Sequence, residues 1–110
     1  MSRHSILVVE DEITLRRLLV YRLSKLFDVR VATNGREALE MVHEAIPDLI
    51  VSDIMMPLMD GYALRRALSE DPSTRIIPFI FLTAKVDGES RNEALRDGVH
   101  DSLPKPFDLD

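Results

Sequence analysis

Short apolar runs alternate along the chain with amphipathic stretches, and this alternation predicts an α/β fold. Residues 6–9 are wholly apolar and rich in β-branched side chains, which is typical of a strand covered on both faces in a parallel sheet. From Ile13 onward, leucines recur at three- and four-residue spacing with basic residues between them, which predicts an amphipathic helix. The apolar positions of this helix are Leu15, Leu18, Leu19, Leu23 and Leu26.

The same alternation continues to the end of the chain. Residues 28–33 alternate with a period of two, which indicates an edge strand with one more exposed face. A second helix is predicted to begin at Asn34, which forms a capping-box pattern with Glu37, and to run until Pro47. The remaining elements are a buried strand at 49–51, a helix opened by Asp60 and Gly61, a strand at 76–83, a weak polar helix at 89–97 and a short strand at 102–103.

Repeated strand–helix units of this length predict a parallel sheet with right-handed crossovers and helices on both faces. The expected fold is therefore doubly wound α/β, and for five parallel strands the common order is the flavodoxin-like 2-1-3-4-5. In such a sheet, ligands bind outside the carboxyl ends of strands 1 and 3, where the direction of winding reverses. The residues at these two strand ends are the first place to look for chemistry.

Composition narrows the classes of function. The 110 residues suffice for one domain, and 45% apolar with 30% charged residues is typical of a folded globular protein. A net charge of -5 argues against direct binding of nucleic acid. The chain has no cysteine, which excludes disulfides and thiolate metal sites and suits a reducing compartment, so we expect a cytoplasmic protein. No apolar stretch approaches the ~18 residues of a membrane helix, and no secretory signal is expected at the start.

Acidic residues lie at the carboxyl ends of the first and third predicted strands. Glu10, Asp11 and Glu12 end the first strand and Asp53 ends the third, so Glu10, Asp11 and Asp53 should converge on one crevice. Carboxylates repel one another, but such a cluster is tolerable if a hard cation lies among them, and a few carboxylates with waters suit Mg²⁺. Either Asp11 or Glu12 could instead cap the following helix, which is the preferred interpretation for Glu12.

Three further residues point to phosphoryl transfer. Thr83 ends the fourth strand beside the small Ala84, and Lys105 follows the fifth strand. Asp53 could attack a phosphoryl group while the metal, Thr83 and Lys105 stabilise its oxygens. The resulting acyl phosphate would persist rather than pass quickly to water, because Met55, two residues after the nucleophile, is not the second acid that a phosphatase would use.

Four segments together make the chain recognisable. Residues 6–12, 53–61, 83–85 and 105–107 resemble, in order and spacing, the receiver domain of two-component response regulators, and the resemblance covers nearly the whole chain. It implies that this domain accepts a phosphoryl group on an aspartate from a histidine kinase or phosphotransfer protein, with Mg²⁺, and switches an output partner or domain. Such a domain is not an enzyme beyond assisting its own phosphorylation and dephosphorylation.

The resemblance also implies a role for each site residue. Asp53 would be the phosphoacceptor, with Asp11, Asp53 and the Met55 carbonyl as direct Mg²⁺ ligands. Glu10, where the family more often has Asp, would act through water. Thr83 and Lys105 would bind the phosphoryl oxygens. Lys85, together with Met55, would tune the lifetime of the acyl phosphate by governing the approach of water.

The chain departs from the family pattern at its carboxyl-terminal end. Ser102 stands where the family usually has an aromatic residue that works with the threonine of the fourth strand, and residues 100–101 are His-Asp instead of an acidic pair. The domain, residues 1–110, is expected to lack most of the fifth helix. We therefore expect the weak helix and its flanking loops to be the most mobile region, and any homodimer to use the surface around the fifth strand.

Two other functions compete with the phosphorylated receiver. A receiver-like scaffold would bind partners without phosphorylation, but the complete set of Asp11, Asp53, Thr83 and Lys105 argues against it. An aspartyl-phosphate hydrolase of the dehalogenase type is disfavoured by Met55.

Overall fold

A computed structural model describes residues 3–83 and 101–104, with the backbone alone for Thr83 and for the last four. Its strands are β1 (Ser5–Val9), β2 (Asp28–Ala32), β3 (Leu49–Asp53), β4 (Phe79–Thr83) and β5 (Asp101–Pro104). Its helices are α1 (Ile13–Leu23), α2 (Gly35–Glu44) and α3 (Gly61–Ser69). All strand pairs are parallel and the order is β2-β1-β3-β4-β5, which confirms the predicted topology.

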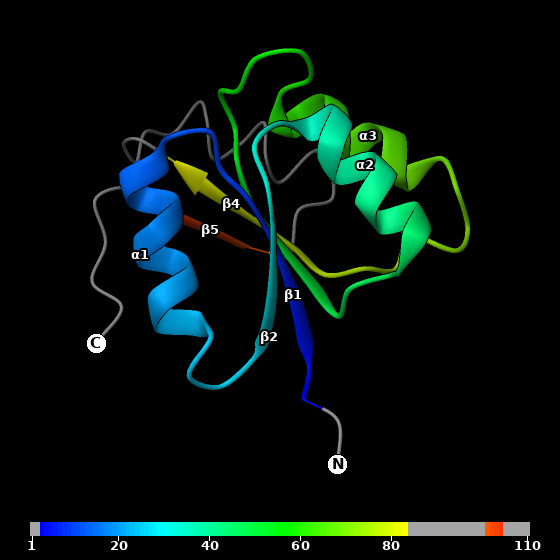
Figure 1. Cartoon of the computed structure of the whole chain (residues 1–110). Helices are drawn as coiled ribbons and strands as arrows, with labels where there is room; N and C mark the ends of the chain where they lie inside the picture. Colours follow the sequence, from blue (N-terminus) through cyan, green and yellow to red (C-terminus); the bar gives the residue numbers. More distant parts are fainter. Residues whose placement is uncertain (1–2, 84–100, 105–110) are drawn as a thin grey trace.

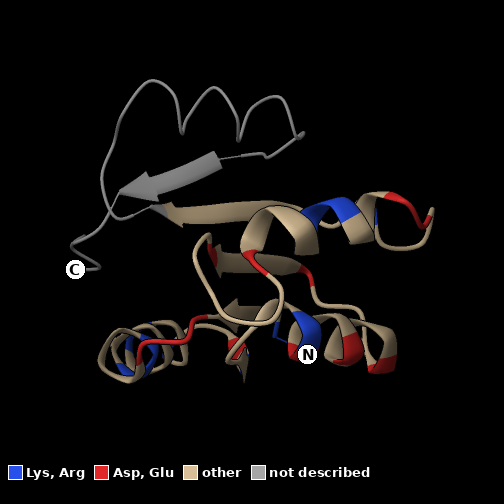
Figure 2. Ribbon diagram, turned by 90° about the horizontal axis from the view of Figure 1, so that it is seen from above, with Lys and Arg blue, Asp and Glu red and all other residues tan. Residues whose placement is uncertain are grey.

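The sheet lies between helices on both faces. Figures 1 and 2 show α1 on one face and α2 with α3 on the other. The strands contribute alternate residues to two separate cores, as the period of two requires. In β1, Leu7 and Val9 pack toward α2 and α3, whereas Ile6 and Val8 pack toward α1, and all four are buried. The wholly apolar run is therefore explained by its central position, as predicted.

Helix boundaries are set by side chains that satisfy the first backbone amides. Asn34 caps α2 by accepting a hydrogen bond from the amide of Glu37 at 2.8 Å, and Glu37 in turn accepts one from the amide of Thr33 at 2.9 Å. Asp60 caps α3 by accepting from the amide of Ala63 at 2.8 Å. The predicted starts of α2 and α3 are thus confirmed.

Some of the predicted boundaries and core positions are wrong. Leu18 and Leu26 are exposed, because α1 packs on the sheet through Leu19 with flanking Leu15 and Leu23 and ends before residue 26. The second helix stops at Glu44, three residues before the proline that was expected to end it. The strand predicted at 76–83 begins at residue 79, since Pro78 precedes it. The weak helix predicted at 89–97 lies outside the described residues.

No helix among the described residues is long and apolar enough to cross a membrane.

Candidate functional site

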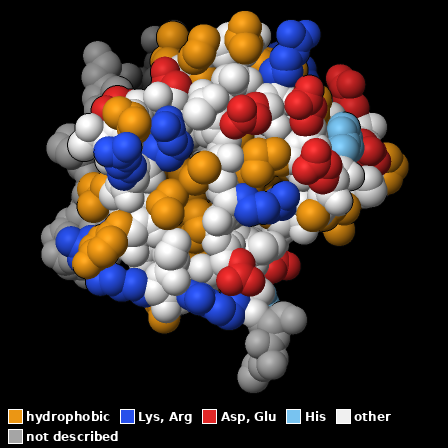
Figure 3. Space-filling model, viewed as in Figure 1, with side chains coloured by type: hydrophobic (Ala, Val, Ile, Leu, Met, Phe, Trp, Pro, Cys, Tyr) orange, Lys and Arg blue, Asp and Glu red, His pale blue; other side chains and the backbone are white. Residues whose placement is uncertain are grey.

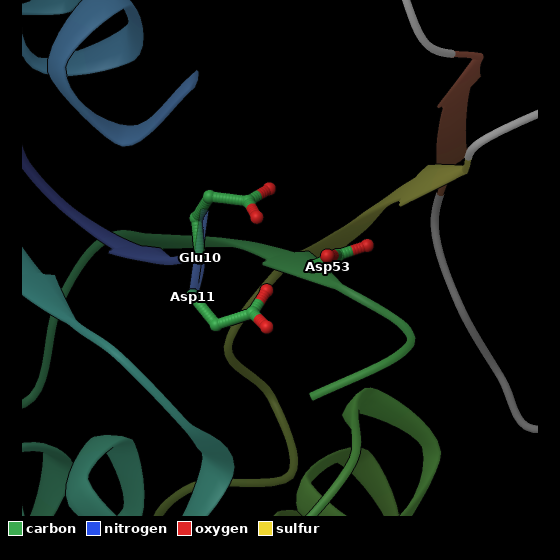
Figure 4. A group of neighbouring side chains, drawn as sticks. All are labelled: Glu10, Asp11 and Asp53. Carbon is green, nitrogen blue, oxygen red and sulfur yellow. The ribbon is translucent and has the colours of Figure 1, made fainter. Parts of the chain in front are cut away.

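Three carboxylates meet at the carboxyl ends of β1 and β3. The two strands are neighbours, with Val9 opposite Ser52, so the residues that follow each strand emerge side by side. Each of Glu10, Asp11 and Asp53 offers an oxygen within 4.8 Å of the other two. Figure 4 shows the three side chains directed toward a common space. The predicted convergence of these acids is therefore present in the structure.

The three carboxylates differ in their surroundings. Glu10 is fully buried and Asp53 is 9% exposed, whereas Asp11 is exposed. The amide of Glu12 donates to Oε2 of Glu10 at 3.1 Å, and the amide of Ile54 donates to Oδ1 of Asp53 at 2.9 Å. These main-chain donors hold both buried carboxylates in place and offset part of the cost of burying charge.

The main chain of the acids is held by hydrogen bonds between and within strands. The amide of Glu10 donates to the carbonyl of Ala32 at 3.0 Å, which extends the pairing of β1 with β2 by one residue. The hydroxyl of Ser52 donates to the carbonyl of Asp53 at 2.8 Å. The acids thus sit on rigid strand ends, as an organised site requires.

Glu12 has the structural role that was preferred for it. Its carboxylate accepts hydrogen bonds from the amides of Thr14 at 3.0 Å and Leu15 at 2.7 Å, which makes it the N-cap of α1. Because a cap stabilises the first turn of a helix, Glu12 anchors the turn that carries Glu10 and Asp11.

The loop after Asp53 returns close to the site. The amide of Gly61 donates to the carbonyl of Ile54 at 2.7 Å, so the first turn of α3 lies against the end of β3. A Cβ at position 61 would stand 2.3 Å from the carbonyl oxygen of Asp53, closer than any side chain can approach. Glycine is therefore required here by a close backbone approach.

The middle of this loop is strained. The amide of Met59 donates to the carbonyl of Pro57 at 2.7 Å, and Leu58 between them has φ of 68°. This is the uncommon classic γ-turn, which a leucine adopts at a cost. The side chain of Leu58 is 79% exposed.

The donor set fits a small hard cation. Octahedral Mg²⁺ with ligands at about 2.1 Å places its ligand oxygens about 3 to 4.2 Å apart. Oxygens of Glu10, Asp11 and Asp53 within 4.8 Å of one another could reach this geometry through small side-chain rotations, or with a water between one carboxylate and the ion. All three donors are hard oxygen ligands, which suits Mg²⁺ better than a soft metal.

The remaining predicted site residues are only partly within the described region. Thr83 ends β4, which pairs with β3 on one side and β5 on the other. Met55 follows the site with its side chain 77% exposed. Ala84, Lys85 and Lys105 lie outside the described residues.

The sequence did not indicate the contacts that two residues, Gly61 and Arg16, make near the acids. Gly61 was expected only to open a helix, although a glycine directly after a capping Asp could have suggested tight packing at a helix start. Arg16 is one of the basic residues between the leucines of the first helix, where a solvent-facing position would be usual, but it is half-buried and its guanidinium donates to the carbonyls of Glu10 and Asp11. Its position six residues after Glu10 gives no sequence signal of that contact.

Comparison with known proteins identifies the family to which the chain belongs. Residues 6–110 match the family model of the response regulator receiver domain, and the chain belongs to that family. It is 40% identical over 104 residues to the response regulator PleD of Caulobacter vibrioides, and 37% identical over 107 residues to the ycf27 protein of Guillardia theta. These matches cover 94% and 96% of this chain but only 23% and 41% of the relatives, so the chain spans less than half of either relative.

A solved receiver domain has the same fold. The receiver domain of the sensor histidine kinase PA1611 from Pseudomonas aeruginosa aligns with a TM-score of 0.89 and 29% identity, covering 98% of this chain and 89% of that one. That structure has a magnesium ion coordinated in its active-site cleft. The present chain is thus a signalling receiver of the kind found in response regulators and histidine kinases, a class that generally is not enzymatic.

Proposed function

We propose that this domain is switched by phosphorylation of Asp53 in the presence of Mg²⁺. The observation that carries the proposal is the cluster of Glu10, Asp11 and Asp53, whose oxygens lie within 4.8 Å of one another at the switch point of the sheet. Asp11, Asp53 and the Met55 carbonyl would hold the ion directly, with Glu10 acting through water. Bound Mg²⁺ would supply neutralisation of the charge on the transferring phosphoryl group.

The other steps of phosphoryl transfer are carried out by residues of the chain. An oxygen of Asp53 forms the new O–P bond while the P–N bond to the donor's phosphohistidine breaks, and the donor imidazole leaves with the electron pair. The Ile54 amide, bonded to Oδ1 at 2.9 Å, orients the carboxylate for this attack. Thr83 and Lys105 donate hydrogen bonds to the phosphoryl oxygens. The domain in this way assists its own phosphorylation and, later, the loss of the phosphate.

The acyl phosphate is expected to outlast that of a hydrolase. Met55 occupies the position where a phosphatase of the dehalogenase type would hold an acid, and its exposed thioether side chain cannot activate water. The hydrolase function is therefore disfavoured. The scaffold function is disfavoured because a receiver that is never phosphorylated has no need of three converging carboxylates.

The partners follow from this chemistry. Receiver domains work in histidine kinase pathways, and we infer that a histidine kinase or a phosphotransfer protein supplies the phosphoryl group here. The phosphorylated domain then switches an output partner or an attached domain in the cytoplasm, without binding nucleic acid itself. Any homodimer would form through the surface around β5.

Intact mass spectrometry tests the proposal. With Mg²⁺ and acetyl phosphate the protein should gain one phosphate, and excess EDTA should prevent the gain. Asp53→Asn should not be labelled, while the matched control Asp48→Asn, at the residue just before β3, should be labelled normally. Labelling of Asp53→Asn at the normal rate would refute the assignment. A wild-type protein that takes up no phosphate would favour the scaffold, and turnover of phosphate esters would favour the hydrolase.

A further inference from the structure

We propose that Arg16 is a positioning residue for the metal-binding carboxylates, a role that rests on the proposed function. Arg16 is the fourth residue of α1 and is half-buried. Its Nη1 donates to the carbonyl of Glu10 at 3.0 Å and to the carbonyl of Asp11 at 3.3 Å. One charged nitrogen therefore holds two consecutive main-chain carbonyls, and those two residues carry two of the three converging carboxylates.

These carbonyls lie where the chain leaves the sheet. The amide of Glu10 still pairs with Ala32 of the neighbouring strand, and by Glu12 the chain has begun to cap α1. The carbonyls in between lie past the end of β1, and the contact at the Glu10 carbonyl is partly buried, where a carbonyl needs a donor. A guanidinium suits this task, because its hydrogen bonds are charge-assisted and its planar shape fixes their direction.

Holding these two carbonyls fixes the carboxylates. The orientation of each peptide plane determines where the attached Cβ points, so the Glu10 and Asp11 side chains are aimed by the main chain that Arg16 holds. The amide of Glu12 completes the arrangement by bonding to Oε2 of Glu10 at 3.1 Å. Loss of Arg16 leaves the cap on α1 intact, so the turn should loosen without unfolding the helix.

The adjacent arginine is a natural control. Arg17 carries the same charge on the same helix turn but is exposed, and none of the hydrogen bonds described to the two carbonyls involves it. Helix α1 has three arginines and no acidic residue, and Figure 3 shows Lys and Arg side chains gathered on the α1 side of the molecule. Replacing Arg16 or Arg17 by Ala therefore removes one positive charge from the same basic helix.

The direction in which Mg²⁺ affinity changes on loss of Arg16 distinguishes a positioning role from a purely electrostatic one. If Arg16 acted only as a nearby positive charge, its removal would reduce repulsion of the cation, and Mg²⁺ would bind more tightly. If Arg16 aims the carboxylates, its removal should weaken Mg²⁺ binding by about 10-fold, at the lower end of what residues supporting metal ligands typically contribute.

Titration calorimetry with Mg²⁺ and hydrogen exchange of the metal-free protein form the test. Arg16→Ala should bind Mg²⁺ about 10-fold more weakly than wild type, Arg16→Lys should bind with intermediate affinity, and Arg17→Ala should match wild type. Without metal, the Glu12 amide, which reports on the Glu10 carboxylate, should exchange faster in Arg16→Ala than in Arg17→Ala. A general loss of stability would instead speed exchange throughout α1.

The outcomes separate this inference from the proposed function. Equal or tighter Mg²⁺ binding by Arg16→Ala, with wild type binding normally, would overturn the positioning role alone. Failure of the wild type to bind Mg²⁺ would overturn the proposed function, and the Glu12 exchange rate would still decide whether Arg16 orders the turn. If Arg16→Ala does not fold, Arg16→Lys carries the comparison, and wild-type affinity together with wild-type Glu12 exchange in that variant would refute the need for a planar guanidinium.

Discussion

Gly61→Ala is expected to damage both the stability of the domain and its carboxylate site. The new Cβ would meet the carbonyl oxygen of Asp53 at 2.3 Å and the Cα of Ile54 at 3.0 Å. Both atoms belong to the backbone at the end of β3, so neither can rotate away as a flexible side chain would. Either α3 must retreat, with loss of the 2.7 Å hydrogen bond from the Gly61 amide to Ile54, or the main chain of Asp53 must move.

The magnitude follows from this geometry. Forcing extra atoms into a well-packed site typically costs about 1–3 kcal/mol, and a contact with immobile backbone belongs near the upper end. Alanine gains at most about 1 kcal/mol over glycine in a helix, and less at the first helical position. The net loss should be about 2 kcal/mol, which for a domain of this size lowers the Tm by about 10 °C.

Thermal and urea denaturation measure this loss, and Ser69→Ala at the other end of α3 is the control for helix propensity. That control should stay within about 0.5 kcal/mol of wild type. Because Asp53 carries one of the clustered carboxylates, Mg²⁺ affinity of Gly61→Ala should also fall. A Tm within about 1 °C of wild type, with unchanged Mg²⁺ affinity, would show that α3 can move away from β3 without cost and that the close approach is not required.

Three further results are expected. Met55→Asp and Lys85→Ala should change the lifetime of the acyl phosphate more than the extent of labelling, and unchanged hydrolysis rates in both variants would contradict their assigned role. Leu58→Gly should stabilise the domain by up to about 1 kcal/mol in urea denaturation, because the positive φ of Leu58 costs about 1–2 kcal/mol while glycine adds entropy to the unfolded chain. A clear loss of stability would argue against strain at Leu58. The hydrogen bond from the Ser5 amide lowers the pKa of Asp48 below its ordinary value of 3.8 in the folded protein. The ionised Asp48 carboxylate therefore stabilises the fold above about pH 4, and this stabilisation is lost as the pH falls through the lowered pKa. Asp48→Asn should therefore flatten the acid end of a Tm-against-pH curve, and a curve of wild-type shape would exclude the contribution.

The sequence alone determined the order and type of the described elements. The apolar run at 6–9 predicted a strand covered on both faces, and its burial in the centre of the sheet confirms this. The pairs Asn34 with Glu37 and Asp60 with the following glycine marked the starts of α2 and α3 correctly, because capping is a local interaction within a few residues. The alternation of strands and helices also predicted parallel strands, whereas the order 2-1-3-4-5 was expected because it is common for five strands.

Positions that depend on contact between elements could not be derived in this way. Leu18 and Leu26 have the spacing of core residues, yet they are exposed, because the sheet offers α1 a contact surface narrower than its apolar stripe and the helix ends early. Periodicity shows which positions could face a core. It does not show how much of that face a neighbouring element covers.

The candidate site was likewise determined partly by the sequence and partly by the tertiary structure. The sequence placed Glu10, Asp11 and Asp53 at strand ends, and the general rule for doubly wound sheets brought those ends together. Tertiary structure decided the rest: that the three oxygens lie within 4.8 Å, that Gly61 touches the main chain of Asp53, and that Arg16 reaches back to two carbonyls. These contacts join residues through strand pairing, helix packing and side-chain reach, and a one-dimensional pattern of residue types contains none of those distances.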